Sequence, residues 1–209
     1  MVGPNYESRL APGSDLRCDI PKYRVWHQGN IVDEPTDATS VWPKDAVSFL
    51  LGCSFTFEND LKRRGLLKKD TASVPMYKTN LKNTPSGPFG GNLVVSMRLF
   101  NPEHVRDAIR ITEGHALSHG GPVAVGHEDR EALGILDLSK PDYGEAPQYS
   151  ATDNHLVPLF WACGVTPQSA IEEAGARIDG VVITHSPGCM FITDVFAGLE
   201  EDEKNINAS

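Results

Sequence analysis

At 209 residues with a formal net charge of −9, the chain is long enough to bury the core of one domain or of two small ones. A hydrophobic fraction of 40% and a charged fraction of 22% are typical of a soluble globular protein, and the lack of a basic stripe excludes nucleic acid as the main partner. The sequence has neither a secretory signal nor an apolar run near the ~20 residues of a membrane helix. We therefore expect a soluble protein with no membrane partner, cytoplasmic or in the mitochondrial matrix.

The first third of the chain predicts a hairpin and two helices. Residues 1–22 are rich in proline, glycine and charge, which indicates an irregular lead-in. An alternating run at 23–27, a turn at 28–30 and an apolar pair at 31–32 favour a short hairpin. One apolar face predicts a helix at 45–51, and a second helix is expected at 57–64, where cations and a glycine mark its end.

A polar segment rich in proline, threonine, asparagine and glycine follows at 70–91. We interpret it as a long loop with a function, because unstructured connections of this length are unusual in compact domains. Beyond it the pattern alternates between strands and helices. The predicted elements are strands at 93–97, 122–126 and 134–138, helices at 101–112 and 127–133, and a polar loop at 140–154.

The stretch 156–194 is the centre of the predicted fold. An apolar run ends at Gly164, Thr166-Pro167 opens a helix, and a second apolar run occupies 180–184. A strand, a helix and a strand in this order predict a β-α-β unit with parallel strands. The predicted fold is a mixed α/β three-layer sandwich with a smaller α+β subdomain, organised as a single unit over 1–209 with an inserted subdomain at about 71–135.

Parallel strands would bring their carboxyl ends to one edge of the sheet, where ligands of open α/β sheets bind. Cys163 and His185 would meet at this edge, beside the amino end of the helix that starts at Thr166. Free backbone N–H groups at a helix amino end favour an anion. The sequence therefore predicts a site for a small acidic molecule.

Three residues are predicted to be catalytic. His185 can transfer protons near neutral pH, although a histidine at a strand end can also bond only a loop. Cys163 at a helix amino end should have a lowered pKa and could act as nucleophile or acid, although free cysteines are commonly small buried residues. Glu58 is a candidate general base, with a role as helix dipole partner as the alternative.

The predicted substrate-binding residues are led by Arg98, which leaves the end of a strand. Its guanidinium can grip a carboxylate, and an internal salt bridge is the equal alternative. For the loop residues Tyr77, Asn80 and His119, a role in forming the local turn is the alternative to ligand binding. The full set is Arg98, Tyr77, Asn80, His119, Thr166, Gln168, Thr184 and Cys53.

Metal and cofactor signals are weak in this sequence. Its four cysteines, Cys18, Cys53, Cys163 and Cys189, have neither zinc nor disulfide spacing, and no histidine pair has helical ligand spacing. Residues 87–91 do not match a phosphate loop. We predict no metal and no cofactor.

Several motifs together resemble the hydro-lyase-like family that includes D-glutamate cyclase. FWACGVTPQ at 160–168 is the most specific of them. The others are DLRCDIPKYR at 15–24, FLLGCSFTFE at 49–58, VPMYKTN at 74–80, GPFGG at 87–91, VVSMR at 94–98, HGGP at 119–122 and ITHSPG at 183–188.

The resemblance implies a lyase that eliminates water from D-glutamate to give 5-oxo-D-proline, working without a cofactor as a homo-oligomer. Arg98 and the N–H groups after Thr166 would hold carboxylates, and His185 with Cys163 or Glu58 would move protons.

This chain also departs from the family pattern. It lacks the usual N-terminal helical segment, Cys189 stands where a histidine is expected, and Ala124 and Val125 replace polar residues. Two alternatives therefore stay open: a dehydratase or cyclase that tailors a larger specialised metabolite, and a non-catalytic ligand-binding relative.

Overall fold

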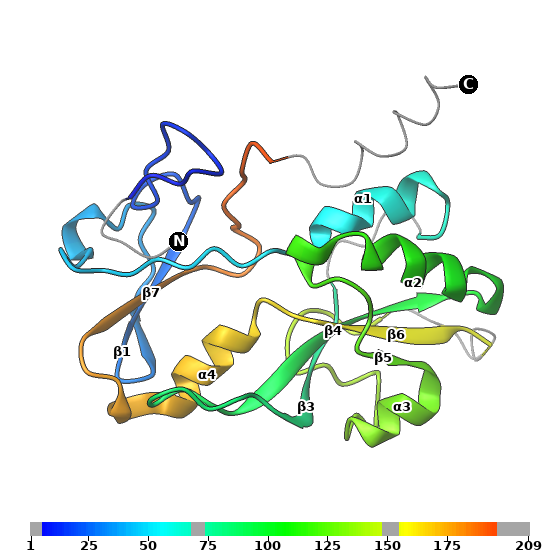
Figure 1. The fold of residues 1–209 in the computed structure, drawn as a ribbon. Helices are drawn as coiled ribbons and strands as arrows, with labels where there is room; N and C mark the ends of the chain where they lie inside the picture. Colours follow the sequence, from blue (N-terminus) through cyan, green and yellow to red (C-terminus); the bar gives the residue numbers. More distant parts are fainter. Residues whose placement is uncertain (1–5, 68–73, 148–154, 196–209) are drawn as a thin grey trace, which may run out of the picture. The chain divides into compact units, whose positions relative to one another are not determined.

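The computed structural model of the protein describes residues 6–67, 74–147 and 155–195 (Figure 1). It has a mixed α/β fold with two antiparallel sheets, of strand orders β2-β1-β7 and β3-β4-β6-β5, which confirms the predicted mixed α/β class. The described residues divide into two compact units. The first unit takes residues 6–50, 84–91 and 167–195, and the second takes residues 51–67, 74–83, 92–147 and 155–166.

The first unit is built on the predicted hairpin, which is confirmed. Strand β1 (Tyr23–His27) pairs antiparallel with β2 (Asn30–Asp33) on one side and with β7 (Val181–His185) on the other. The hairpin turn needs left-handed backbone at Gln28 (φ 49°) and Gly29 (φ 78°). A Cβ on Gly29 would lie 2.6 Å from the Cα of Gly175, so only glycine permits this approach.

Helix α4 (Thr166–Ala174) begins at the predicted Thr-Pro pair and supplies the core of the first unit. Trp26 of β1 packs with Ile171, Ala174 and Ile178. Two short 3-10 helices complete the described elements of this unit, η1 (Thr39–Val41) and η5 (Gly175–Arg177).

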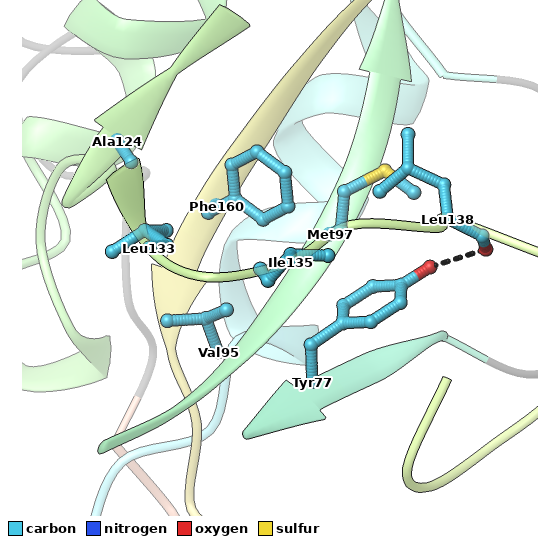
Figure 2. Close-up of a cluster of buried hydrophobic side chains, with 8 residues drawn as sticks. All are labelled: Tyr77, Val95, Met97, Ala124, Leu133, Ile135, Leu138 and Phe160. Atoms are coloured by element: carbon cyan, nitrogen blue, oxygen red, sulfur yellow. Dashed lines mark hydrogen bonds between the residues drawn. The ribbon is translucent and has the colours of Figure 1, made fainter. Parts of the chain in front are cut away.

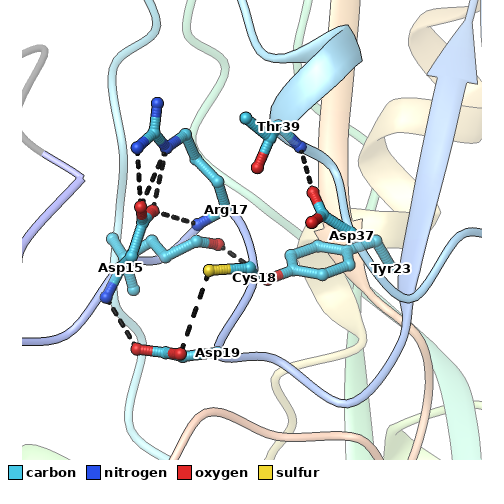
Figure 3. Close-up of polar contacts among 8 residues, drawn as sticks. Asp15, Arg17, Cys18, Asp19, Tyr23, Asp37 and Thr39 are labelled. Atoms are coloured by element: carbon cyan, nitrogen blue, oxygen red, sulfur yellow. Dashed lines mark hydrogen bonds and ion pairs between the residues drawn. The ribbon is translucent and has the colours of Figure 1, made fainter.

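A polar turn that precedes β1 is fixed by local hydrogen bonds (Figure 3). The Asp15 carboxylate accepts hydrogen bonds from the backbone N–H and the guanidinium of Arg17. The hydroxyl of Tyr23 donates to the Leu16 carbonyl at 3.0 Å and accepts from the Ile20 N–H at 3.0 Å. Tyr23 is fully buried, and burial raises the pKa of its hydroxyl to about 12.

The second unit holds the longer sheet, whose side chains alternate between two apolar layers. On one face Val95 and Met97 of β4 and Phe160 of β6 pack with Tyr77 and with the segment 133–138 (Figure 2). The strands of this sheet are β3 (Met76–Lys82), β4 (Asn92–Phe100), β5 (Ala124–Val125) and β6 (Val157–Ala162).

The opposite face of this sheet is covered by two helices. Phe57 and Leu61 of α1 and Ala108 of α2 pack against Phe100 and Trp161. The helices of the second unit are α1 (Phe55–Arg63), α2 (Val105–Glu113) and α3 (Gly126–Ala132), with 3-10 turns η2 (Pro102–His104) and η3 (Ala116–Ser118).

The predicted parallel β-α-β unit is wrong, although its two strands and its helix are all present. Strand β6 pairs antiparallel with β4 and β5, whereas β7 pairs antiparallel with β1 in the other sheet. Apolar runs identify strands but not their partners, and residues far apart in sequence supply both partners here. The predicted three-layer sandwich requires a parallel sheet, and all pairs of the described strands are antiparallel.

Three local predictions are also wrong. The segment 45–51 is irregular rather than helical, with Val47 and Phe49 exposed, so its apolar residues do not form one buried stripe. Residues 134–138 form turns and irregular backbone rather than a strand, although Ile135 and Leu138 still enter the core. The expected loop at 70–91 contains β3, where Tyr77 and Thr79 are buried and their polar neighbours face outward.

The other predicted helices and strands are present, with small shifts of their ends. The prediction of a single unit with an inserted subdomain at about 71–135 stays a prediction. Within the described ranges, no helix is long and apolar enough to cross a membrane.

The hydrogen bond from the Tyr77 hydroxyl to the Leu138 carbonyl (2.7 Å) ties β3 to the buried segment 133–138. We predict that Tyr77→Phe lowers the free energy of unfolding by about 1–3 kcal/mol, because the buried carbonyl loses its donor. Urea unfolding followed by circular dichroism measures this. Tyr6→Phe is the control, since the Tyr6 ring stacks on Arg17 and its hydroxyl has no hydrogen bond within the described residues. Equal stability of the two variants would contradict the prediction.

Candidate functional site

The buried Arg98 is the centre of the candidate site in the second unit. It lies on β4, on the sheet face that also carries Trp161 and Phe100, and its side chain is only 3% exposed. The guanidinium donates from Nε and Nη2 to Oε1 of Glu58 on α1, at 3.0 and 2.5 Å. A charge at this depth needs such a partner, because isolated ions are costly to remove from water.

Two serines complete the binding of the guanidinium. Nη1 donates to Oγ of Ser96 at 2.8 Å, and Nη2 donates to Oγ of Ser54 at 2.9 Å. Arg98 therefore makes four hydrogen bonds to residues that the structure describes, out of five N–H groups. The rings of Phe57 and Trp161 lie 5.3 and 5.5 Å from its Cζ.

These contacts show the internal salt bridge that the sequence left as one of two alternatives for Arg98. The second oxygen of Glu58 lies 3.3 Å from Lys62 Nζ, so both carboxylate oxygens have cationic partners. This arrangement favours Glu58 as a residue that orients Arg98. A substrate-binding role of Arg98 stays a prediction. The group available for it is the one guanidinium N–H that makes no hydrogen bond to the described residues.

Three polar side chains lie within electrostatic range of Arg98: Cys53, His119 and Cys163. We call these three residues together with Ser54, Glu58 and Arg98 the Arg98 cluster. All six belong to the second unit.

The thiols of the cluster differ from the expectation. Burial raises the pKa of Cys163, against smaller lowering effects of a hydrogen bond with the Val165 backbone and of the Arg98 charge. The predicted lowered pKa is therefore wrong, because desolvation outweighs the helix amino end. Burial likewise raises the pKa of Cys53. The sulfur of Cys163 lies 3.4 Å from Sδ of Met76. Both thiols are protonated at neutral pH and can give a proton.

His119 enters the cluster from the turn after η3. Its backbone is left-handed (φ 78°), which is uncommon for a residue with a side chain. Burial lowers its pKa, and the positive charge of Arg98 lowers it further. The imidazole is therefore neutral at neutral pH.

A second group of predicted residues lies in the first unit, around the buried Gln168. Its side-chain amide donates to the carbonyl of His185 at 3.2 Å and accepts from Arg24 Nη1 at 3.2 Å. Arg24 Nε also donates to Glu34 at 3.1 Å. We call Arg24, Glu34, Gln168 and His185 the Gln168 cluster. Burial lowers the pKa of His185, and the charge of Arg24 lowers it further, so this imidazole is also neutral at pH 7.

Two predicted threonines have structural partners. Thr184 Oγ1 accepts the indole N–H of Trp26 at 2.9 Å. Thr166 Oγ1 accepts a hydrogen bond from the Val94 N–H at 3.0 Å and donates one to the Val94 carbonyl at 3.2 Å. The hydroxyl thus bonds both backbone groups of Val94, as a residue of a neighbouring strand would. The two bonds of Thr166 connect it to Val94 of β4, and both residues belong to the second unit.

Tyr77 and Asn80 also make structural contacts. Tyr77 is buried in the core shown in Figure 2. The Asn80 amide donates to the Ala132 carbonyl at 2.8 Å, and its backbone N–H donates to the Leu133 carbonyl. Their roles as ligand-orienting residues stay predictions.

The predicted meeting of Cys163 with His185 involves both units. Cys163 belongs to the second unit and His185 to the first, so their juxtaposition stays a prediction. The wrong parallel pairing removes the argument from sheet edges that first suggested it.

The sequence analysis missed some residues of the two clusters and of their hydrogen-bond partners. Ser54 and Ser96 carry no sequence signal for their bonds to Arg98. Arg24 and Glu34 could have been found, because the predicted hairpin places them near each other across the β1–β2 pair.

A cavity of about 370 Å³ lies in the first unit, apart from the predicted site residues. It is lined by residues 11–14, 190–192, Asp19, Pro21 and Asp194. Among residues 6–67, 74–147 and 155–195, no three histidine, cysteine or acidic side chains gather as a metal site.

Comparison with known proteins gives one family. The family model described as D-glutamate cyclase matches residues 47–194. A Rubrobacter xylanophilus protein that carries the name "Putative hydro-lyase" is 50% identical over 188 residues, covering 88% of this chain and 70% of that protein. Proteins of the same name from Arthrobacter sp. and Bradyrhizobium sp. are 50% and 48% identical over 91% and 89% of this chain, and 69% and 66% of their own lengths.

We predict that Glu58→Gln lowers the free energy of unfolding by about 3–5 kcal/mol, because Arg98 keeps its charge without a carboxylate partner. Urea denaturation measures the loss. The matched control is Asp107→Asn, which breaks an exposed ion pair with Arg110 and should cost about 0–1 kcal/mol. A loss in Glu58→Gln no larger than in the control would show that the buried pair does not stabilise the unit.

The raised pKa of Cys163 predicts slow alkylation. At pH 7, iodoacetamide should modify Cys163 much more slowly in the folded protein than in the urea-unfolded chain, since the thiolate is the reactive form. Peptide mass spectrometry over a time course gives both rates. Equal rates would contradict the protonated, buried thiol.

Proposed function

Because the chain belongs to the D-glutamate cyclase family, we propose that it is a hydro-lyase that converts D-glutamate to 5-oxo-D-proline. The observation that carries the proposal is the family match over 47–194, since this range contains all three predicted catalytic residues. The relatives named as hydro-lyases support elimination of water as the reaction class.

The proposed reaction joins the two ends of one molecule. The amine nitrogen of glutamate forms a bond to its γ-carboxyl carbon, and one carboxylate oxygen leaves. The ammonium group gives up two protons, and both end on the departing oxygen as water. The enzyme must therefore accept a proton from nitrogen and deliver a proton to oxygen, while it holds the chain in a bent conformation.

The residues of the two clusters support specific roles in this scheme. His185, neutral at pH 7, accepts a proton from the ammonium group. Cys163, protonated at pH 7, delivers a proton to the leaving oxygen. We favour Cys163 over Glu58 as the acid because both oxygens of Glu58 are bound by cations.

Substrate positioning is assigned to Arg98 and His119. The remaining N–H of Arg98 and the imidazole of His119 hold one carboxylate. Intramolecular orientation of this kind can contribute about 7–11 kcal/mol to lowering the barrier, which makes it the largest part of the proposed catalysis.

The direct test incubates the purified chain with D-glutamate and, in parallel, with L-glutamate. We expect 5-oxoproline, detected by mass spectrometry as loss of one water, from D-glutamate only. A larger carboxylate turned over in preference to D-glutamate would replace the substrate and keep the reaction class. Binding of D-glutamate without product would overturn the enzymatic proposal.

His185→Ala should lower kcat by about 10²–10⁴-fold with the fold intact, the range expected for loss of a general base. The control is His27→Ala, an exposed histidine on β1 of the same unit. Initial rates and circular dichroism of both variants make the comparison. Turnover by His185→Ala at the rate of the control would remove His185 from the mechanism.

The pH dependence of kcat/KM tests the same group. A base must be deprotonated, and burial lowers the His185 pKa, so activity should persist as pH falls below the ordinary value of 6.5 and fail only at lower pH. A profile whose acid limb lies at or above pH 6.5 would contradict this assignment.

A further inference from the structure

A histidine–aspartate pair lies next to the Arg98 cluster, and the proposed mechanism does not use it. His115, between α2 and η3, has a side chain that is 4% exposed, and its Nε2 lies 2.8 Å from Oδ2 of Asp60 on α1. The other oxygen of Asp60 is bound by Arg63. The sequence analysis assigned neither residue a role, because 55 residues separate them.

Two acidic residues of helix α1 therefore bind side chains from two different segments of the chain. Glu58 binds Arg98 of β4, and Asp60, two residues further on, binds His115 of the loop after α2. The ring of Phe57 packs against both partners, 6.3 Å from the His115 ring and 5.3 Å from Arg98 Cζ. Arg98 and His115 thus share one aromatic neighbour.

The backbone of His115 forms the turn that carries His119. Its carbonyl accepts the N–H groups of Ser118 at 2.8 Å and Gly120 at 3.1 Å. These two bonds enclose His119, whose left-handed backbone the surrounding contacts must maintain. The position of the His115 peptide thus fixes the residue that lies near Arg98.

The same loop abuts the segment before α1. A Cβ added to Gly52 would lie 1.7 Å from the Leu117 carbonyl, so the backbones are in close contact. Gly52 directly precedes Cys53 and Ser54 of the Arg98 cluster. A shift of the loop would therefore displace cluster residues as well as His119.

The position of the His115 ring leaves one of its nitrogens buried without a hydrogen bond to the described residues. Its Nδ1 is buried and has no hydrogen-bond partner among the described residues. The contact with Asp60 occupies Nε2 and leaves Nδ1 as an unsatisfied buried polar atom, which a merely apolar anchor would avoid. The bond to Asp60 is the feature that explains a histidine at this position.

We propose that Asp60 and His115 form a positioning pair, which fixes the turn 115–120 and thereby places the His119 imidazole beside Arg98. This inference rests on the proposed function for its kinetic consequences only. Asp60 and His115 act through His119 and do not touch the substrate.

The kinetic test is a double-mutant cycle on Asp60 and His119. Asp60→Ala should raise KM for D-glutamate by about tenfold and leave kcat nearly unchanged, as His119→Ala should. The double variant should be no worse than His119→Ala alone, because Asp60 acts only through His119. Asp60→Asn keeps an acceptor for Nε2–H and should restore KM, whereas the control Asp107→Ala, an exposed acid of α2, should have no effect. Fully additive effects would overturn the proposal.

A second readout does not depend on turnover. The ring resonances of His119, recorded by NMR, should shift in Asp60→Ala and return towards their wild-type values in Asp60→Asn. Unshifted resonances in Asp60→Ala would overturn the proposal. If the wild-type chain does not convert D-glutamate, the proposed function fails and this experiment still decides the positioning role.

The wild-type protein provides a third readout should Asp60→Ala fail to fold. The amides of Ser118 and Gly120 should be protected from hydrogen exchange, and the His115 nitrogen shifts should show a proton on Nε2 that is bonded to Asp60. Exchange of these amides at the rate of an open loop would overturn the proposal without any variant.

Discussion

The second unit depends on a buried ion pair between Arg98 and Glu58. A sheet face that elsewhere carries Trp161 and Phe100 places a guanidinium under helix α1, where water cannot solvate it. Glu58 and two serines replace that solvation with directed hydrogen bonds. The helix and the sheet are therefore joined by a geometry that allows little displacement, since a small shift would leave a buried charge without its partner.

This constraint also sets the electrostatics around the pair. The positive charge of Arg98 acts on Cys53, His119 and Cys163, yet burial outweighs it at both thiols and acts with it at the imidazole. The result is a set of neutral groups around a compensated ion pair. At neutral pH such a thiol can give a proton and such an imidazole can accept one, and each transfer leaves a charge on the group.

Local sequence patterns predicted most elements because the forces that define them are local. The turn at Gln28-Gly29, the Thr166-Pro167 helix start and the cation-rich end of α1 all act within a few residues. The failures have physical causes of the same kind. Strand β3 was missed because its outward-facing residues are polar. The irregular segment at 45–51 has apolar residues at helical spacing, but Val47, Phe49 and Leu51 are exposed.

The sequence by itself determined the family, the mixed α/β class, and the residue types available for proton transfer and for carboxylate binding. The tertiary structure alone decided that β6 and β7 belong to different sheets, that Arg98 is paired with Glu58, and that Asp60 meets His115. The pKa of Cys163 was decided there too, because burial outweighed the helix end that the sequence suggested. The reason is the same in each case: pairing partners and desolvation arise from residues far apart in the chain, and a local pattern carries no information about them.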